Sequence, residues 1–253
     1  MRTPLMAANW KMHLNRREAK TLVEDLLKAI DGTSNEVLIC PPTLLFDTVQ
    51  AACKGSKVAT GVQNMHFADK GAFTGEVSAE MVKEAGAGYV IIGHSERRAI
   101  FGETDEMCAK KVLQADAFGL VPVLCVGESL QERESGSTTK VIDTQLNGSL
   151  EGFTPTSGDR LVIAYEPVWA IGTGKTATPA DAETVIKHIR ERLSEKYGER
   201  IANSVRVLYG GSVKPDNVDE LMAQPNIDGA LVGGASLEAE SFARIVNFQV
   251  HAK

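Results

Sequence analysis

The sequence predicts an α/β protein that forms a single domain, a closed (β/α)8 barrel with eight parallel strands. Two observations carry this prediction: eight short apolar runs, often β-branched, recur along the chain, and stretches of helical periodicity separate them. No Ser-, Gly- or Pro-rich linker interrupts the pattern, so we expect residues 1–253 to form one domain. The 253 residues, 43% of them hydrophobic, suffice for one large core, because such barrels run to about 250 residues.

The apolar runs have the character of strands that are buried on both faces of a parallel sheet. Their residues are apolar almost without alternation, whereas a strand with one solvated face alternates apolar and polar residues. Their starting positions lie 20 to 44 residues apart, which leaves room for a crossover after each strand. The predicted strands are Leu5–Asn9, Val37–Cys40, Lys57–Gln63, Tyr89–Gly93, Val121–Val126, Leu161–Glu166, Val205–Tyr209 and Gly229–Gly233.

The segments between the runs carry helix signals. In the segment 18–30, four apolar residues share one face opposite charged residues. Thr178 before Pro179 predicts an N-cap with proline at the first helical position, and Gly32 and Gly119 follow predicted helix ends. Eight strand–helix units allow a closed barrel or an open doubly wound sheet, and their even distribution favours the barrel.

Charge and composition exclude several classes of function. The net charge is −6 and long basic blocks are absent, which excludes nucleic acid and anionic membranes as partners. By itself this charge would also disfavour an anionic substrate. The four cysteines form no CxxC and the five histidines no HxH or HExxH pair, so we expect no disulfide framework and no metal site. The sequence shows neither signal-peptide zones nor an apolar run of about 18 residues, so we expect a cytoplasmic protein.

Three ionisable residues follow three different predicted strands. Lys11 follows the first strand, His94 the fourth and Glu166 the sixth. Each alone has a common structural explanation, but in a barrel all three converge on the C-terminal mouth, where active sites lie. A carboxylate directly after a buried strand is costly to ionise, so we expect a raised pKa for Glu166.

The segment after the sixth strand predicts a lid over this mouth. Its end, Gly174-Lys175-Thr176, is similar to the end of a phosphate-binding P-loop, but that motif requires glycine at position 169, which is tryptophan. Glycines permit hinge motion, and the bulky Trp169 and Ile171 would be unusual on a loop that faces only solvent. The predicted lid consists of Pro167, Val168, Trp169, Ala170, Ile171, Gly172, Thr173, Gly174, Lys175 and Thr176.

Paired glycines after the last two strands predict a phosphate site. Gly210-Gly211 follows the seventh strand, and Gly233-Gly234 follows the eighth. Glycines let the main chain approach a ligand, and N–H groups that open a helix attract anions. The loops after the seventh and eighth strands of a barrel commonly build such a site.

These motifs closely resemble the triosephosphate isomerase family. The resemblance covers nearly the whole chain in the same order and spacing, and it implies a TIM barrel. It also implies an isomerase of glycolysis and gluconeogenesis that interconverts dihydroxyacetone phosphate and glyceraldehyde 3-phosphate through an enediol(ate), without a cofactor. The segments that carry it are Ala8–Met12, Gly75–Glu76, Gly93–Arg98, Ala164–Thr176, Tyr209–Val213 and Leu231–Ser236.

The resemblance implies a role for each strand-end residue. Glu166 is implied as the base, His94 as a neutral electrophile, and Lys11 as the positive charge beside Asn9. Glu96 and Ser95 are implied as supporting residues, together with Cys125 as a buried packing residue. The residues implied in substrate and phosphate binding are Asn9, Lys11, Gly172, Ser212, Leu231, Gly233 and Gly234, with Gly210 lining the pocket.

The loop at residues 64–76 resembles the arm through which subunits of the family interlock, and it implies a homodimer. The implied arm residues are Phe73, Thr74, Gly75 and Glu76. Thr74 would approach the partner's Asn9 and the partner's Lys11. The residues Met65-His66-Phe67 of this arm depart from those typical of the family.

Four other classes of protein fit the sequence less well. A Schiff-base aldolase needs a lysine on a mid-to-late strand, and the predicted strands five to eight carry none; a metal-dependent epimerase needs His or Asp ligands at several strand ends, which are missing. A non-catalytic phosphometabolite-binding barrel would usually lack Lys11, His94 or Glu166. A hydrolase with a nucleophile elbow requires glycine at position 97, which is arginine.

Overall fold

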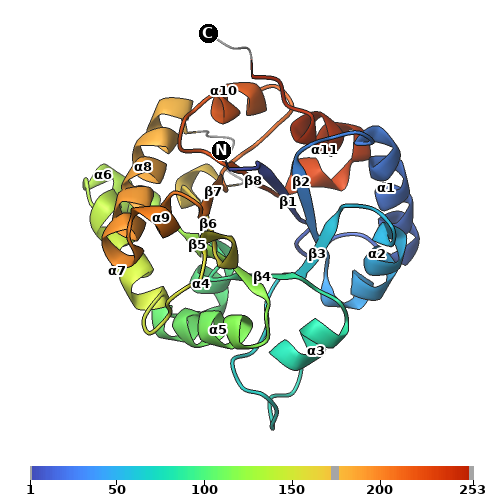
Figure 1. Ribbon diagram of the computed structural model, residues 1–253, viewed down its shortest axis with the longest axis horizontal. Helices are drawn as coiled ribbons and strands as arrows, with labels where there is room; N and C mark the ends of the chain where they lie inside the picture. The colour runs from blue at the N-terminus through green and yellow to red at the C-terminus, as the bar shows by residue number, and fades with distance from the viewer. Residues whose placement is uncertain (1, 172–176, 251–253) are drawn as a thin grey trace.

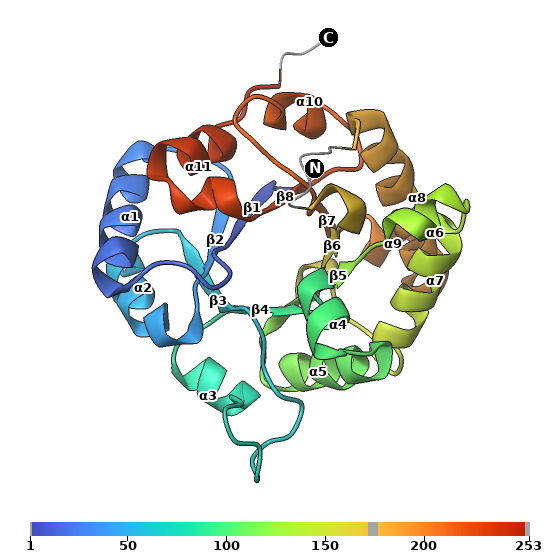
Figure 2. The ribbon, with the colours of Figure 1, turned by 180° about the vertical axis from the view of Figure 1, so that it is seen from behind.

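The computed structural model describes residues 2–171 and 177–250, and its eight parallel strands close into a barrel. Each strand pairs with its neighbours in sequence, and β8 pairs with β1 to close the ring, which the helices surround (Figures 1 and 2). The predicted (β/α)8 barrel is therefore confirmed. The strands are β1 (Leu5–Asn9), β2 (Glu36–Cys40), β3 (Ala59–Val62), β4 (Tyr89–Ile92), β5 (Val121–Val126), β6 (Val162–Tyr165), β7 (Arg206–Tyr209) and β8 (Gly229–Val232).

The helices begin and end where local signals require. The predicted segment 18–30 forms α1, which begins earlier because Asn15 and Glu18 make a capping box. Thr178 caps α8 through the N–H of Asp181, so the predicted N-cap is confirmed. The helices are α1 (Arg16–Ala29), α2 (Phe46–Cys53), α3 (Ala79–Glu84), α4 (Ser95–Phe101), α5 (Asp105–Ala117), α6 (Leu130–Glu134), α7 (Thr138–Ser149), α8 (Pro179–Tyr197), α9 (Glu199–Ala202), α10 (Val218–Met222) and α11 (Ala239–Val246), with short 3₁₀ turns η1 (Thr43–Leu45), η2 (Gly158–Arg160), η3 (Val168–Ala170) and η4 (Gly234–Leu237).

Alternate residues of each strand face the barrel interior or the helices. In β1, Leu5 and Ala7 belong to the inner cluster of buried side chains, whereas Met6 and Ala8 belong to the cluster that includes the helices. The same parity, continued two residues past the inner Ala7 and Ala164, directs Asn9 and Glu166 into the mouth. The strand pattern thus sets which polar residues enter the site.

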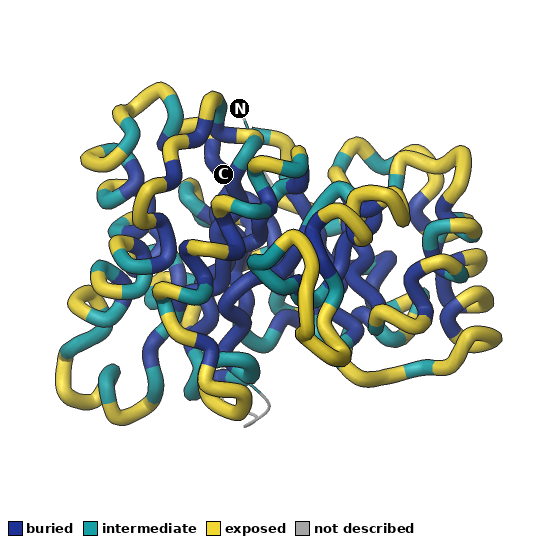
Figure 3. Tube along the Cα trace, turned by 90° about the horizontal axis from the view of Figure 1, so that it is seen from below, coloured by how far each residue is buried: buried dark blue, intermediate teal, exposed yellow. Residues whose placement is uncertain are grey.

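The core occupies the strands and the inner faces of the helices (Figure 3). The outer faces are exposed, and the loop 64–76 projects from the ring before α3 (Figures 1 and 2). Among the helices of the described residues, none is long and apolar enough to cross a membrane.

Candidate active site

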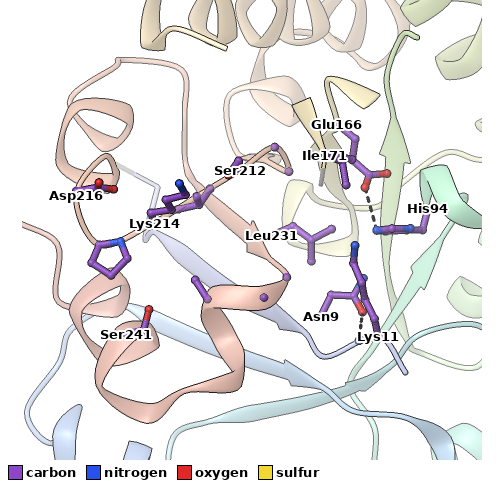
Figure 4. A pocket seen from close by; sticks show the side chains of 17 residues that line it. Asn9, Lys11, His94, Glu166, Ile171, Ser212, Lys214, Asp216, Leu231 and Ser241 are labelled. Carbon is purple, nitrogen blue, oxygen red and sulfur yellow. Dashed lines mark hydrogen bonds and ion pairs between the residues drawn. The ribbon is translucent and has the colours of Figure 1, made fainter. Parts of the chain in front are cut away.

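The C-terminal ends of the strands enclose a cavity of about 660 Å³. Glu166, His94, Lys11 and Asn9 gather on one side of it, with Leu231 facing them and Ser212 farther along (Figure 4). The sequence-predicted residues in its lining are Asn9, Lys11, His94, Glu166, Ile171, Gly210, Ser212, Leu231, Gly233 and Gly234. Of the predicted lid, Gly172, Thr173, Gly174, Lys175 and Thr176 lie outside the described residues.

Glu166 is 2% exposed, and its carboxylate is held by the start of α4. It accepts hydrogen bonds from the Ser95 amide at 2.9 Å and the Ser95 hydroxyl at 3.3 Å, and it contacts His94 Nε2 at 3.0 Å. Burial raises the pKa of Glu166, but His94 and the Ser95 amide lower it further than burial raises it, so the net direction is downward. The expected raised pKa is therefore wrong, because the sequence shows the apolar strand but not these donors.

His94 stands at the N-cap of α4, where its ring nitrogens have different partners. Nδ1 accepts the amide N–H of Glu96 at 3.2 Å, which leaves no room for a proton on that nitrogen. The ring proton therefore lies on Nε2 and donates to Glu166. Burial lowers the pKa of His94, but the adjacent Glu166 carboxylate raises it further, so the net direction is upward. The Glu96 N–H that Nδ1 accepts leaves that nitrogen unprotonated in this arrangement, so the ring carries its one proton on Nε2 and is neutral.

Lys11 is held in the mouth by an unusual backbone conformation and three contacts. Its φ is +52°, and its amide donates to Asn9 Oδ1 at 3.1 Å. Lys11 Nζ donates to Glu96 Oε1 at 2.6 Å. The amide of Gln63 donates to the carbonyls of Lys11 at 2.9 Å and Cys40 at 3.0 Å. Sequence reasoning missed Gln63, although its position directly after β3 is a strand end like those of the predicted site residues.

Main-chain N–H groups face the other side of the cavity. Within the described part of the chain, the N–H groups of Ser212, Gly233 and Gly234 donate to no protein acceptor. A Cβ on Gly233 would lie 3.8 Å from Lys11 Nζ, so these amides and the ammonium group are close together. The arrangement suits a small anion.

Gly210 gives the Glu166 side chain space to move. A Cβ at position 210 would lie 2.9 Å from Glu166 Cγ and 3.2 Å from the carbonyl oxygen of Tyr165. Its amide donates to that same carbonyl at 2.7 Å, so the two strand ends are held together. Any larger residue here would crowd the carboxylate.

Glu128 is a second buried carboxylate near the mouth, and sequence reasoning missed it. It accepts hydrogen bonds from the Tyr165 hydroxyl at 3.1 Å and from Trp169 Nε1 at 2.8 Å. Arg133 lies over the Trp169 ring at 4.6 Å. These contacts fix the first part of the predicted lid, 167–171, to the end of β5. Glu128 could have been found in the sequence, because it lies two residues after the apolar run of β5, as a strand-end residue does.

Cys125 lies inside the barrel next to the carboxylate. It is fully buried, and burial together with the adjacent Glu166 charge raises the pKa of its thiol well above its usual range. The thiol therefore stays protonated at neutral pH and packs beside the Glu166 carboxylate. No group of three or more His, Cys, Asp or Glu in residues 2–171 and 177–250 could hold a metal ion.

Comparison with known proteins agrees with this geometry. A family model described as triosephosphate isomerase matches residues 4–249. The chain belongs to the triosephosphate isomerase family. The triosephosphate isomerase of Moorella thermoacetica is 56% identical over 250 residues, covering 98% of this chain and 99% of that one. That of Roseiflexus sp. (strain RS-1) is 53% identical over 249 residues, covering 98% of each chain. The crystal structure of triosephosphate isomerase from Bartonella henselae matches with a TM-score of 0.88 and 40% identity, covering 96% of this chain and 98% of that chain.

In this member of the family, the loop 64–76 is internally ordered. The His66 ring stacks on Phe67 at 4.3 Å and on Phe73 at 4.1 Å, and its amide donates to the Val77 carbonyl at 2.8 Å. Asp69 accepts a hydrogen bond from Gln114 of α5. His66 and Phe67 therefore help to shape the loop.

A second cavity of about 630 Å³ adjoins the mouth on the side of this loop. Met12 and Leu44, which are 93% and 84% exposed, line it together with Phe101. Lys11 and His94 line it as well, so it opens directly onto the candidate active site. An exposed apolar wall of this kind is typical of an interface.

Proposed function

We propose that this family member interconverts dihydroxyacetone phosphate and D-glyceraldehyde 3-phosphate through an enediol(ate). The observation that carries the proposal is the contact between the Glu166 carboxylate and a neutral His94 ring inside one cavity. A base and a hydrogen-bond donor placed side by side suit proton transfer next to a carbonyl group.

Glu166 takes the proton from the carbon next to the carbonyl and returns it to the neighbouring carbon. Its lowered pKa leaves it ionised at neutral pH, as a base must be. To reach a substrate it exchanges its contacts with Ser95 and His94 for the substrate carbon, and no side chain at Gly210 obstructs this movement.

His94 polarises the carbonyl through its Nε2 proton and moves protons between the two oxygens of the enediol(ate). A positioned base supplies roughly 10²- to 10⁴-fold, which is too little alone for this proton transfer. A preorganised donor contributes roughly 3–4 kcal/mol to stabilising the developing oxyanion. The Lys11 ammonium group, oriented by Glu96, stabilises the negative charge on the same oxygen. Asn9, which accepts the Lys11 amide, helps to orient the substrate oxygens.

The phosphate binds to the main-chain N–H groups of Ser212, Gly233 and Gly234 and to Lys11. Local N–H groups and one ammonium hold it, so the net charge of −6 does not oppose binding. Ile171, with the rest of the lid and Gly172, covers the base and excludes water, because an enediolate phosphate can lose its phosphate by elimination. Leu231 and Gly210 line the pocket.

We further propose that the chain works as a cytoplasmic homodimer, with the loop 64–76 of one copy against the 630 Å³ cavity of the other. Thr74 at the loop tip would then approach the partner's Lys11. All of residues 1–253 would belong to the one barrel domain in each copy.

Proton exchange during turnover tests this function. The protein is incubated in D₂O with dihydroxyacetone phosphate, and the products are followed by ¹H NMR. We expect glyceraldehyde 3-phosphate with deuterium at the carbon next to the carbonyl, since an enediol(ate) exchanges its proton with solvent. Carbon–carbon cleavage or the absence of exchange would contradict the proposal.

A further inference from the structure

The Glu166 main chain rests on a glycine of the neighbouring strand end. The Glu166 amide donates to the Val126 carbonyl at 2.8 Å, and the Val168 amide donates to the Glu128 carbonyl at 3.0 Å. Gly127 lies between these two bonds. A Cβ at this position would lie 1.7 Å from the carbonyl oxygen of Glu166 and 2.6 Å from its carbonyl carbon. The peptide of Gly127 is therefore the surface on which the catalytic carboxylate's backbone sits.

The polar groups of Gly127 are held by one side chain of α7. The Gly127 amide donates to Gln145 Oε1 at 2.7 Å, and Gln145 Nε2 donates to the Gly127 carbonyl at 3.0 Å. Two antiparallel bonds to one planar amide fix both the position and the orientation of this main chain. Both bonds join the strand end to α7, outside the strand barrel, so the strand end cannot shift relative to α7 without breaking them.

Packing alone does not hold this strand end. A cavity of about 280 Å³ lies behind Glu166, and Gly127, Gln145 and Glu166 all line it. Because this space adjoins the Gly127 main chain, the two hydrogen bonds hold it on the side where packing contacts are few. Gln145 is not among the described residues that line the substrate cavity.

We infer that Gln145 is a positioning residue: it braces Gly127 and thereby sets where Glu166 stands when the carboxylate moves to the substrate. This inference rests on the role proposed for Glu166. A displacement of about 1 Å in a reacting group costs up to about 100-fold in rate, so a loosened brace lowers the catalytic constant and leaves distant binding groups unaffected.

The test uses Gln145→Met, which keeps the side-chain length and removes both hydrogen bonds. We expect kcat to fall about tenfold, with the inhibition constant for inorganic phosphate within twofold of wild type, because the phosphate groups lie on β7 and β8 loops. Thr144→Val is the matched control: the Thr144 hydroxyl bonds only to Lys140 within α7 among the described groups, and its kcat should not change.

Two results would overturn the inference. One is a wild-type kcat in Gln145→Met; the other is an equal loss of kcat and phosphate binding, which marks a merely structural role. If Gln145→Met fails to fold, Gln145→Glu decides in the same assays, since it keeps an acceptor for the Gly127 amide but loses the donor. Glu166→Gln is measured in parallel: if it stays active, the proposed role of Glu166 fails, whereas an inactive Glu166→Gln beside a fully active Gln145→Met refutes only the brace.

Discussion

The two ends of the barrel both bury charged side chains, but they use them differently. At the N-terminal end, Arg190 donates to Asp228 at 2.5 Å and to the carbonyls of Ala202 and Val205. Asp228 also accepts the Val207 amide at 2.9 Å and contacts Arg2. Every one of these bonds joins fixed groups of the protein, so this end holds strands β7, β8 and β1 together.

At the C-terminal end the charges face a cavity instead. Glu166 and His94 bind each other on one side of it, and the N–H groups of Ser212 and Gly233 have no protein acceptor in the described structure. Groups with exchangeable or unused bonding capacity can bind a substrate, whereas saturated ion pairs cannot. A buried charge therefore marks a site only when its partners can be exchanged for a substrate.

The largest effect is expected from Glu166→Gln, which removes the carboxylate at the C-terminal end of the barrel. The variant lacks a base, so we expect kcat to fall roughly 10³-fold while the thermal midpoint stays close to wild type. A coupled isomerase assay and thermal denaturation measure both. Glu166→Asp serves as the control, because it keeps a carboxylate and should retain more activity. Near-wild-type turnover in Glu166→Gln would contradict the assignment of the base.

Asp228→Asn removes one partner of the buried ion pair with Arg190 at the N-terminal end of the barrel. It leaves the Arg190 charge buried without its partner, so we expect a loss of about 3 kcal/mol in the free energy of unfolding and little change in kcat of the folded enzyme. Urea denaturation measures the first and the coupled assay the second. Glu24→Gln, which disrupts the exposed pair with Lys20, is the control and should change stability by less than about 0.5 kcal/mol. A loss of kcat without a loss of stability in Asp228→Asn would contradict the purely structural role assigned to the N-terminal end.

Thr74→Arg tests whether the loop 64–76 of a second copy docks beside the candidate active site. The added charge at the loop tip should prevent docking beside the partner's Lys11, so we expect a shift from dimer to monomer with roughly tenfold lower activity. Sedimentation velocity and the coupled assay follow the two effects. Ser34→Arg adds the same charge to an exposed position at the N-terminal end and should change neither. An unchanged sedimentation profile for Thr74→Arg would rule out the arm.

The smallest effect is the pH dependence of stability that Glu166 contributes. Its pKa lies below the ordinary value of 4.5 in the folded protein, so folding favours its ionised form. This stabilisation is complete above the unfolded pKa and is lost as the pH falls through the lower folded pKa. We expect the unfolding free energies of wild type and Glu166→Gln to converge as the pH falls below about 4.5, measured by urea denaturation. A difference that grows on acidification would show a raised pKa instead.

Much of the fold followed from local pattern. The run at 57–63 shows the limit: it forms a strand only over Ala59–Val62, because Gln63 turns away to bind the carbonyls of Lys11 and Cys40. The apolar pattern could not show that bond, since its acceptors stand 23 and 52 positions away. The same reason hid Gln145, which lies in the middle of an ordinary amphipathic helix.

The eight strands and the residues at each strand end were predictable from the sequence. They follow from local chemistry, because apolar runs define strands and polar residues end them. The direction of Asn9 and Glu166 into the mouth was not, because runs that are apolar on both faces do not show which face is inside. The ionisation of Glu166 depends on the tertiary fold, because the Ser95 amide that helps to lower its pKa comes from α4, seventy-one positions away. The contacts of Glu128 and Gln145 depend on the tertiary fold as well. A side chain's electrostatic surroundings depend on which distant groups the fold brings within hydrogen-bond distance, and no local pattern encodes them.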